Sequence, residues 1–369
     1  MSVPEEAEPR RYLGTLTLPY ENLRTIYAGG SEVRKYRNEL TDQLLVGKRV
    51  GTIGLESTFV VREATLLQQI RHDNLVPVFD VVRVTGLDIP PPIQVLEIIM
   101  PFYERGSVCD AFSRGDRFTL GEARDLVLAA LRGLSELHDR RILHRDVKTP
   151  NLLLTDDTTR VKLGDLGVAV PMDEDGTADV LAYSPQLWTA PETYTVGRID
   201  RRADLYSMGI VLHEVLSGPL PYERYPPERC LERLSHGRPA PAPRDLTPGP
   251  YVPRSLRRVV TKATRTDPAG RYRSAHDMAD ALAAVRLIDW IPVVDGEDRR
   301  IWEGRLPNRR NQEFQVEVWR SRRGHWRGTA RRRGRAWRRI WSEDQELADG
   351  CNGSDLALLF DRVVDFATR

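Results

Sequence analysis

The sequence ILHRDVKTPNLLL (residues 142–154) encloses a polar octet between two apolar runs. The octet contains a possible base, Asp146, a possible cation, Lys148, and a possible metal ligand, Asn151. Because apolar runs are usually buried in a folded protein, they would hold the octet as a short loop between two buried segments. Two interpretations are open at this point. The loop is either a solvated turn with a satisfied aspartate or the working part of an enzyme.

Three further motifs follow the octet at suitable distances. Asp165, in KLGDLG (162–167), comes fourteen residues after Asn151, and APE (190–192) and DLYSMG (204–209) come later. A single tripeptide would be weak support for any function, but an ordered set of motifs with suitable gaps is specific. With these motifs the chain resembles the eukaryotic-type (Hanks-type) serine/threonine protein kinases, a class that bacteria also contain.

The resemblance implies an α+β fold with two lobes. The sequence agrees, because β-type runs such as QLLVGKRV (43–50) lie in the first part of the chain and helical spacing dominates afterwards. In GEARDLVLAALRGLSELHDR (121–140), apolar residues recur every three or four positions, which predicts a helix with one buried face. The expected bounds are 14–288 for the kinase domain, with a β-rich N-lobe at about 14–100, a hinge at 101–106 and a mostly helical C-lobe at 107–288.

The resemblance also implies roles for the polar residues. Phosphoryl transfer requires that the phosphates are held, that their charge is neutralised and that the attacking hydroxyl is aimed in line. Asp146 is the expected base, and Lys148 would reach the transferred phosphoryl group, as in serine/threonine rather than tyrosine kinases. Asn151 and Asp165 would supply oxygen ligands to Mg²⁺ or Mn²⁺, together with the phosphates of ATP. A solvated loop would not explain why both residues occur where metal ligands are needed.

The ATP site implied by the resemblance begins in the N-lobe. Lys48, in LLVGKRV (44–50), would pair with the α- and β-phosphates, and Glu63 would be its ion-pair partner on the following helix. The alternative is that Lys48 is a surface lysine and Glu63 an ordinary helix charge. The other expected nucleotide contacts are Gly29, Gly30, Val33, Met100, Pro101 and Tyr103.

Two departures from the family pattern bear on activity. The glycine-rich loop is reduced to TIYAGGSEVRKY (25–36), in which fewer backbone amides can approach a phosphate. Two consequences are open, weaker ATP binding or an altered lid over the nucleotide. In YSPQLWTAPE (183–192), the family's usual threonine is not clearly placed: Pro185 is one candidate for its position, and Ser184 and Thr189 are nearby hydroxyls. Because the base and the metal ligands are all present, an active kinase is favoured over the alternative, a pseudokinase that signals by binding.

Three residues are expected to have structural roles. Asp204 resembles the helix residue that braces the His144–Arg145 backbone, and Arg271 resembles the arginine that pairs with Glu192. Arg145, next to the base, suggests a pocket for a phosphorylated activation segment. The candidate phosphosites in that segment are Thr177, Tyr183 and Ser184, and autophosphorylation is expected.

The composition favours a globular cytoplasmic protein. The chain has 369 residues, of which 40% are hydrophobic, and no apolar run is long enough to suggest a membrane span. The first residues, MSVPEEAEPRR, are acidic and lack the apolar core of a secretion signal. The three cysteines are isolated, so neither a disulfide framework nor a zinc site is expected.

The C-terminal part differs from the rest in charge. Residues 299–341 contain fifteen arginines and three glutamates, whereas the whole chain has a net charge of only +2. Three runs, QEFQVEVWRS, GHWRGTARRR and RAWRRIWSE, read as strands, and GSDLALLFDRVVDFA (353–367) reads as a helix with Ser354 at its N-cap. A basic β-β-β-α domain is therefore expected over 296–369, after a boundary near 293–300.

Three functions are open for this basic domain. Its arginines are merely solvated, or they bind nucleic acid, because basic strands with interleaved aromatic residues suit phosphates and bases. The third possibility is that residues 299–341 bind an acidic partner protein or the kinase body itself. A kinase also implies protein substrates, which the sequence does not identify, and the sequence does not predict the oligomeric state.

Overall fold

The computed structural model divides the chain into two units, which are described separately. Unit 1 comprises Met1–Gln68 and Val78–Phe102, and unit 2 comprises Gln69–Pro77 and Tyr103–Arg369. The structure describes residues 19–28, 31–51, 68–84, 95–156, 161–166, 168–180, 186–307, 309–348, 350 and 353–368.

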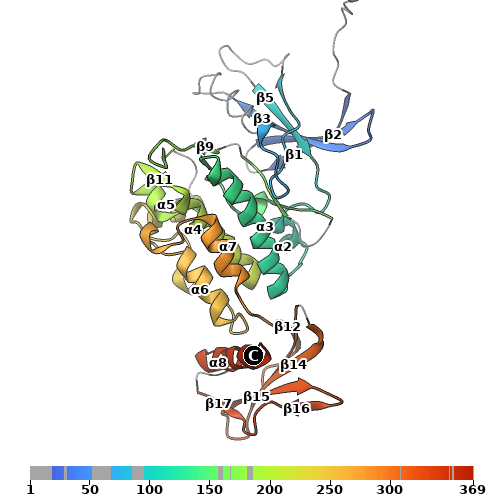
Figure 1. The fold of residues 1–369 in the computed structure, drawn as a ribbon, viewed down its shortest axis with the longest axis vertical. Coiled ribbons are helices and arrows are strands. Elements are labelled where there is room, and N and C mark those ends of the chain that lie inside the picture. Colours follow the sequence, from blue (N-terminus) through green and yellow to red (C-terminus); the bar gives the residue numbers. More distant parts are fainter. Residues whose placement is uncertain are drawn as a thin grey trace, which may run out of the picture. The chain divides into compact units, whose positions relative to one another are not determined.

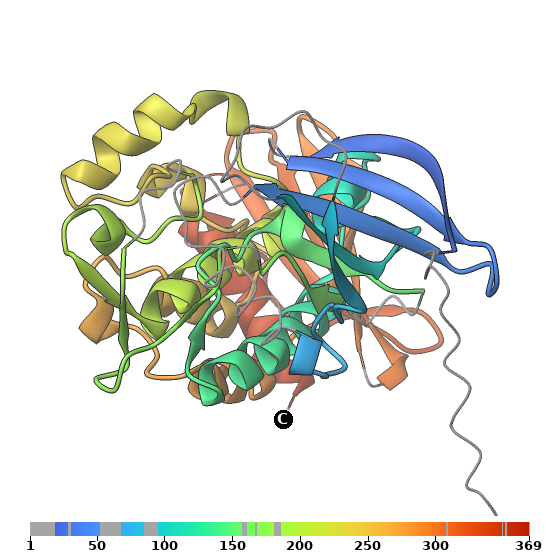
Figure 2. The ribbon, with the colours of Figure 1, turned by 90° about the horizontal axis from the view of Figure 1, so that it is seen from above.

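Unit 1 is a five-stranded antiparallel sheet in the order β1-β2-β3-β5-β4. Its strands are β1 (Tyr20–Ala28), β2 (Ser31–Asn38), β3 (Leu44–Gly51), β4 (Asp80–Val84) and β5 (Val95–Pro101). The sheet is twisted, as the blue strands in Figure 2 show. One face carries a small core of Tyr36, Leu45 and Ile99. The predicted β-rich N-terminal part is thus confirmed.

Unit 2 contains the predicted helical part, in which α3, α4, α6 and α7 pack side by side (Figure 1). The helix α3 begins with a capping box between Thr119 and Glu122, which satisfies the first free N–H groups. The central helix α4 is buried around most of its circumference, so it lacks the polar stripe of a surface helix. The helices are α2 (Val108–Ser113), α3 (Leu120–Asp139), α4 (Arg201–Ser217), α5 (Pro227–Ser235), α6 (Arg254–Ala263) and α7 (Ala275–Ala283).

Short strands and 3-10 turns position the loops of unit 2. β6 pairs with β9, β7 with β8, and β10 with β11, all antiparallel. The strands are β6 (Ile142–Leu143), β7 (Leu152–Leu154), β8 (Val161–Leu163), β9 (Val170–Pro171), β10 (Thr177–Asp179) and β11 (Arg198–Asp200). The 3-10 turns are η1 (Thr149–Asn151), η2 (Pro191–Tyr194), η3 (Tyr222–Arg224), η4 (Pro243–Leu246) and η5 (Pro268–Gly270).

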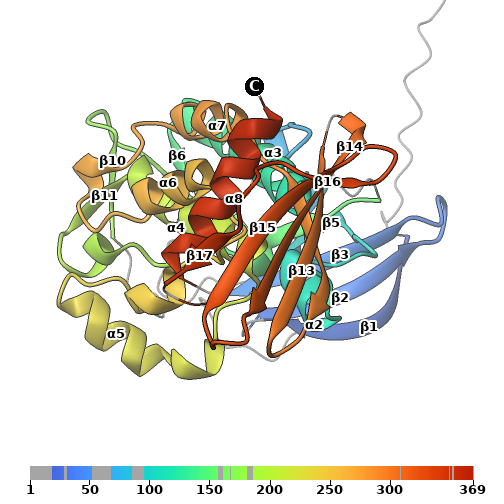
Figure 3. The same cartoon turned by 90° about the horizontal axis from the view of Figure 1, so that it is seen from below.

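A second sheet followed by one helix forms the C-terminal module, residues 289–368. The strands β12 to β16 follow one another in space, and β17 pairs with β15 beside β16. Figure 3 shows α8 lying along this sheet. The elements are β12 (Asp289–Asp295), β13 (Arg299–Leu306), β14 (Arg309–Arg320), β15 (Trp326–Arg333), β16 (Trp337–Arg339), β17 (Gln345–Leu347) and α8 (Ser354–Ala367).

The predicted order of a sheet and then a helix is confirmed, but the sheet has six strands instead of three. The predicted boundary near 293–300 is the hairpin between β12 and β13, so the sheet begins at Asp289, before residue 296. Turn residues such as those of DGED are also typical of linkers, which is why the hairpin resembled a domain boundary. Gly353, and not Ser354, occupies the N-cap of α8.

The core of the module lies between α8 and one sheet face. The Phe360 ring contacts Trp290 and Trp302 edge-on, with centroid distances of 5.0 and 5.3 Å. Gly328 lies under α8, where an added Cβ would come within 2.8 Å of Leu359. A larger residue at 328 would therefore push the helix from the sheet.

Two carboxylates attach the module to the helices of unit 2. Asp289 accepts a hydrogen bond from the backbone N–H of Gly121 in the first turn of α3, at 2.6 Å. Asp361 on α8 accepts from the backbone N–H of Arg254, the first residue of α6, at 2.7 Å, and from the Arg257 guanidinium at 2.8 Å. Both carboxylates thus lie at the positive ends of helices. Burial raises the pKa of each.

Candidate active site

The segment His144–Asn151 is a loop held by a buried carboxylate. Asp204, in the first turn of α4, accepts hydrogen bonds from the backbone N–H of His144 at 2.9 Å and of Arg145 at 2.8 Å. The ring of His138 lies 2.9 Å from the same carboxylate. Burial by itself would raise the pKa of Asp204, but the bond to His138 and the nearby His144 hold it below its ordinary value. Arg145 has a positive φ of 64°, which this brace maintains.

The three polar residues of the octet lie together. The Lys148 ammonium is 2.8 Å from the Asp146 carboxylate, and the Asn151 side-chain amide donates to the same oxygen at 2.9 Å and to the Asp146 carbonyl at 2.8 Å. The two side-chain contacts share one carboxylate oxygen and fix the direction of the Asp146 carboxylate. A satisfied loop aspartate would also accept hydrogen bonds, so the contacts alone do not choose between the two interpretations.

Asp165 follows Gly164, whose backbone is hydrogen-bonded to this loop. The N–H of Gly164 donates to the Asn151 carbonyl at 2.8 Å, and the His144 ring lies 3.0 Å from the Gly164 carbonyl. Asp165 itself has a positive φ of 59°, a conformation that aspartate tolerates better than most residues. The fold thus brings Asp165 next to the octet, although the two are separated by β7 and β8.

The residues of the loop suit a hard cation. Asn151 turns its amide nitrogen to Asp146, so its amide oxygen faces the other way, and among the described residues none donates a hydrogen bond to that oxygen. No group of three or more His, Cys, Asp or Glu that could hold a metal lies within the described part of the chain. Mg²⁺ commonly binds through one or two protein oxygens together with substrate phosphates, which fits a set of one amide and one carboxylate.

Lys148 has a second partner that the sequence did not reveal. Its ammonium donates to the Gln186 side-chain oxygen at 3.1 Å, and the Gln186 backbone N–H donates to the Thr189 hydroxyl at 3.1 Å. Gln186 follows Pro185, which lies outside the described residues. The Gln186 amide therefore contacts Lys148 from the segment YSPQLWTAPE (183–192), in which the family's usual threonine is not clearly placed.

In unit 1, three of the predicted nucleotide contacts share one face of the sheet. Val33 on β2 is directly opposite Lys48 on β3, and Met100 on β5 is opposite Val46. Since opposite residues and alternate residues point to the same side, Val33, Lys48 and Met100 lie on one face. All three are half-buried.

The other residues predicted to contact the nucleotide lie in unit 1, in unit 2 or outside the described residues. Pro101 ends β5, and Tyr103 belongs to unit 2, where its carbonyl accepts from the N–H of Gly106 at 3.0 Å. Burial raises the pKa of the Tyr103 hydroxyl to about 12. Gly29, Gly30 and Glu63 lie outside the described residues.

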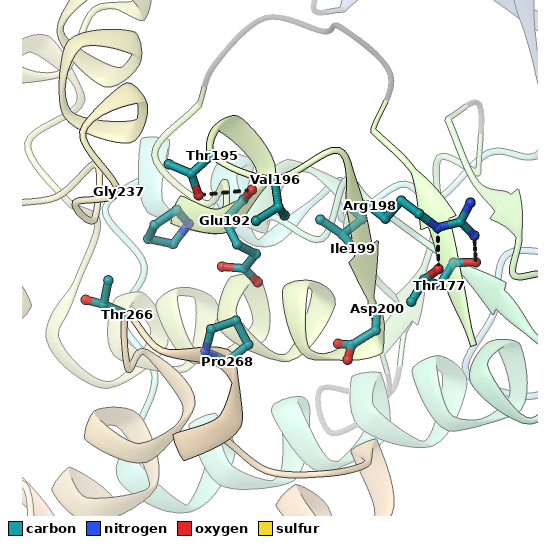
Figure 4. Close-up of a pocket in the computed structure, with 11 residues that line it drawn as sticks. Thr177, Glu192, Thr195, Val196, Arg198, Ile199, Asp200, Gly237, Thr266 and Pro268 are labelled. Atoms are coloured by element: carbon teal, nitrogen blue, oxygen red, sulfur yellow. Dashed lines mark hydrogen bonds between the residues drawn. The ribbon is translucent and has the colours of Figure 1, made fainter. Parts of the chain in front are cut away.

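Glu192 forms an ion pair with Arg271. The guanidinium of Arg271, whose side chain is completely buried, binds both carboxylate oxygens of Glu192 at 2.6 and 2.7 Å. It also donates to the carbonyls of Arg202, Arg265 and Thr266. This ion pair lies beside a cavity of about 330 Å³ lined by Glu192, Thr177 and Arg198, among others (Figure 4).

Thr177 is the only one of the three candidate phosphosites among the described residues. Its hydroxyl donates to Asp175 at 2.8 Å and accepts from the Arg198 guanidinium at 2.7 Å. Tyr183 and Ser184 lie outside the described part of the chain. Arg145, the expected phosphate-binding residue, donates to the backbone carbonyls of Val168 at 2.5 Å and Asp179 at 3.5 Å.

Two buried glutamates were also not found from the sequence. Glu214 on α4 accepts from Tyr222 at 2.6 Å and Trp188 at 2.7 Å, and burial raises its pKa. In unit 1, Glu97 accepts from the Tyr36 hydroxyl at 2.5 Å. A glutamate inside an apolar helix, as in VLHEVL, is a signal that could have indicated Glu214.

Comparison with known proteins shows the family to which the chain belongs. Residues 20–281 match the family of the protein kinase domain. The chain belongs to the protein kinase family. The kinase match ends before the C-terminal module, which no family match covers. Among the described residues, every helix is too short or too polar to span a lipid bilayer.

Relatives of this kinase occur in bacteria and plants. The chain is 31% identical to serine/threonine-protein kinase pkn2 of Myxococcus xanthus over 230 residues, which is 60% of this chain and 26% of that protein. It is 36% identical to serine/threonine-protein kinase STY46 of Arabidopsis thaliana over 176 residues, 47% of this chain and 28% of that protein. It is 28% identical to a probable serine/threonine-protein kinase of Clostridium perfringens over 279 residues, 72% of this chain and 38% of that protein. The chain thus matches well under half the length of these relatives.

Proposed function

We propose that the protein is a serine/threonine protein kinase that transfers the γ-phosphoryl group of ATP to a protein hydroxyl. The observation that supports this most directly is the cluster of Asp146, Lys148 and Asn151 next to Gly164 and Asp165. The fit to the protein kinase family and the names of the relatives support the same activity. The lysine two positions after the base favours serine and threonine over tyrosine as acceptors.

Each residue of the cluster has one task in this proposal. Asp146 accepts a hydrogen bond from the substrate hydroxyl, orients its oxygen towards the γ-phosphorus and takes its proton as the bond to phosphorus forms and the bond to ADP breaks. Lys148 offsets negative charge on the transferred phosphoryl group. Asn151 and Asp165 would hold Mg²⁺ or Mn²⁺, and the bound ion would neutralise part of the charge of the phosphates.

Unit 1 supplies the proposed contacts to the rest of the nucleotide. Lys48 pairs with the α- and β-phosphates, with Glu63 as its partner, and Val33 and Met100 contact the adenine. We assign the adenine hydrogen bonds to the Pro101 carbonyl and the Tyr103 N–H, because Pro101 has no N–H to donate. Gly29 and Gly30 are the proposed phosphate-loop glycines.

Transfer of label from ATP to a protein substrate tests the proposal. The native chain with Mg²⁺ is expected to label a serine- or threonine-containing protein and, we propose, itself, and mass spectrometry locates the labelled residues. Lys48→Met should abolish labelling. If the native chain binds nucleotide and transfers nothing, the pseudokinase alternative is correct.

We further propose that the kinase domain extends over 14–288 and that the C-terminal module binds nucleic acid. Several arginines of the module are paired with carboxylates, as Arg299 and Arg331 are with Glu317. Others are exposed and form no ion pair with any carboxylate of the described residues, namely Arg322, Arg323, Arg327, Arg332, Arg335 and Arg338.

The hairpin of β15 and β16 concentrates this unneutralised charge. Arg332 lies directly opposite Arg338, a like-charge pair that destabilises an antiparallel ladder unless an anion lies nearby. Trp337 is half-buried in the same hairpin, under the guanidinium of Arg333. A two-stranded ribbon with arginines suits the phosphates of a nucleic-acid groove.

A salt titration tests this second proposal. Binding to a labelled duplex or single strand should weaken steeply as salt concentration rises, and Arg332→Ala with Arg338→Ala should reduce the slope. If nucleic acid does not bind while removal of the module raises the kinase rate, autoregulation is the better assignment. If an acidic protein binds instead, the module is a docking site for that partner.

We also propose a cytoplasmic location for the protein.

A further inference from the structure

Residues 173–179, which belong to the expected activation segment (165–192), fold as an acidic hairpin. The residues DEDGTAD (173–179) contain four carboxylates, and a turn at Gly176, with a φ of 82°, reverses the chain. The N–H of Asp173 donates to the Thr177 carbonyl at 2.7 Å, which closes the turn. Strand β10 then pairs with β11, the stretch that leads into α4. The segment is therefore attached to the main helical core by backbone hydrogen bonds.

The guanidinium of Arg198 on β11 contacts three of the acidic side chains of this hairpin. It contacts the carboxylates of Asp173, Asp175 at 3.5 Å and Asp179 at 3.2 Å, and it donates to the Thr177 hydroxyl at 2.7 Å. Figure 4 shows the Arg198 and Thr177 side chains together at the edge of the cavity. We refer to Asp173, Asp175, Thr177, Asp179 and Arg198 as the Arg198 cluster.

The cluster is connected to the catalytic loop through Asp179. The Asp179 carboxylate contacts Arg198, whereas its carbonyl accepts from the guanidinium of Arg145, the neighbour of the base Asp146. The same guanidinium binds the Val168 carbonyl at 2.5 Å. Arg145 therefore holds the segment at two backbone positions, and between these positions the side chains of the cluster hold it to β11.

A phosphate on Thr177 would not fit this arrangement. It would add a charge of roughly −1.5 to −2 beside three carboxylates that share one guanidinium. The hydroxyl is already engaged as a donor to Asp175 and as an acceptor from Arg198. In this chain three carboxylates already contact the Arg198 guanidinium.

We propose that Arg198 is a positioning residue that orders the activation segment through carboxylates, so that the kinase works without phosphorylation of Thr177. The inference rests on the proposed kinase function. In this inference the carboxylates of Asp173, Asp175 and Asp179 bind the Arg198 guanidinium in place of a phosphate. Thr177 is then a structural hydroxyl of the hairpin, and not its switch.

The test compares unphosphorylated proteins, made in the presence of a phosphatase and checked by intact mass. Arg198→Ala should lower kcat for a protein substrate by roughly tenfold or more, with little change in the KM for ATP, because the segment no longer holds its position. Arg198→Lys should retain part of the rate, since an ammonium meets fewer carboxylates than a guanidinium does. Arg273→Ala, an exposed arginine on the way to α7, is the matched control and should behave as the native chain does.

Two variants of Thr177 separate this mechanism from activation by phosphate. Thr177→Val removes the acceptor but keeps the carboxylates and should retain most of the rate. Thr177→Glu adds a fourth carboxylate to the cluster and should be slower than Thr177→Val. If phosphorylation of Thr177 is required, the unphosphorylated native chain and Thr177→Val are inactive and Thr177→Glu is the faster variant, which would overturn the proposal.

Hydrogen exchange of residues 168–180 gives a readout that does not depend on activity. Exchange in this segment should be slow in the unphosphorylated native chain and markedly faster in Arg198→Ala, with Arg273→Ala unchanged. Equal exchange in the native chain and Arg198→Ala would refute the positioning role even if the protein transferred no phosphate. If the native chain transfers no phosphate but its hydrogen exchange is slow and depends on Arg198, the kinase proposal is refuted. The positioning role of Arg198 in the hairpin would still hold.

Discussion

The side-chain amide of Asn151 donates to the Asp146 carboxylate at 2.9 Å. The two residues belong to one loop, whose backbone is braced by Asp204 from α4. The proposed base and one proposed metal ligand are therefore positioned by the same contact, and a change in either residue should affect both proposed tasks.

Asn151→Ala removes both the hydrogen bond to Asp146 and the amide oxygen proposed for the cation. The Mg²⁺ concentration that gives half the maximal rate should rise by roughly 10- to 100-fold, measured as phosphotransfer against Mg²⁺ at fixed ATP. Chelation of divalent cations should abolish transfer by the native chain. An unchanged Mg²⁺ dependence would remove Asn151 from the metal site.

Asp204→Ala should act on stability. The change leaves the N–H groups of His144 and Arg145 and the buried ring of His138 without their shared acceptor. The free energy of unfolding should fall by roughly 3–5 kcal/mol, measured by urea denaturation. Asp280→Ala, an exposed aspartate on α7, serves as the control. A loss no larger than the control's would mean that Asp204 does not brace the loop.

His213 on α4 should make the protein sensitive to acid. Burial lowers its pKa from 6.5 to about 4. Below pH 6.5 the unfolded chain therefore takes up a proton that the folded chain does not, so this group costs stability progressively as the pH falls to about 4. The total is roughly 3 kcal/mol. In urea denaturation at several pH values, His213→Gln should lose less stability over this range than the native chain, while the exposed His236→Gln should lose as much.

Asp361→Ala should weaken the attachment of the C-terminal module. The N-cap of α6 is Pro253, which offers no side-chain cap, so the Asp361 carboxylate is the group that accepts from the first N–H of this helix. Its loss should cost about 1–2 kcal/mol in thermal or urea unfolding. Asp365→Ala, an exposed aspartate one turn further along α8, is the matched control. If both variants unfold alike, the Asp361 cap does not stabilise the protein.

The parts of the fold that the sequence predicted are those determined by local patterns. The helix α3 follows from its apolar spacing, and the loop 144–151 follows from the ordered motifs. The extra strands of the module were not predicted because the hairpin between β12 and β13 has the composition of a linker.

The side-chain partners of the site residues could not be predicted, because they come from segments that are distant in the sequence. Gln186 reaches Lys148 across 38 residues, and Tyr36 meets Glu97 across 61. The contacts of Arg198 with Asp173, Asp175 and Asp179 require the pairing of β10 with β11, which no local pattern indicates. Such pairs follow from topology, which a single sequence specifies only indirectly.

The most direct test of the account is the rate at which label moves from ATP to a serine or threonine hydroxyl in the presence of Mg²⁺, compared between the native chain and Asp146→Asn. Both proteins should fold and bind nucleotide alike, and the variant should transfer the phosphoryl group at least roughly 100-fold more slowly, because it lacks the base. Equal rates in the two proteins, or a native chain that neither binds nucleotide nor transfers phosphate, would contradict it.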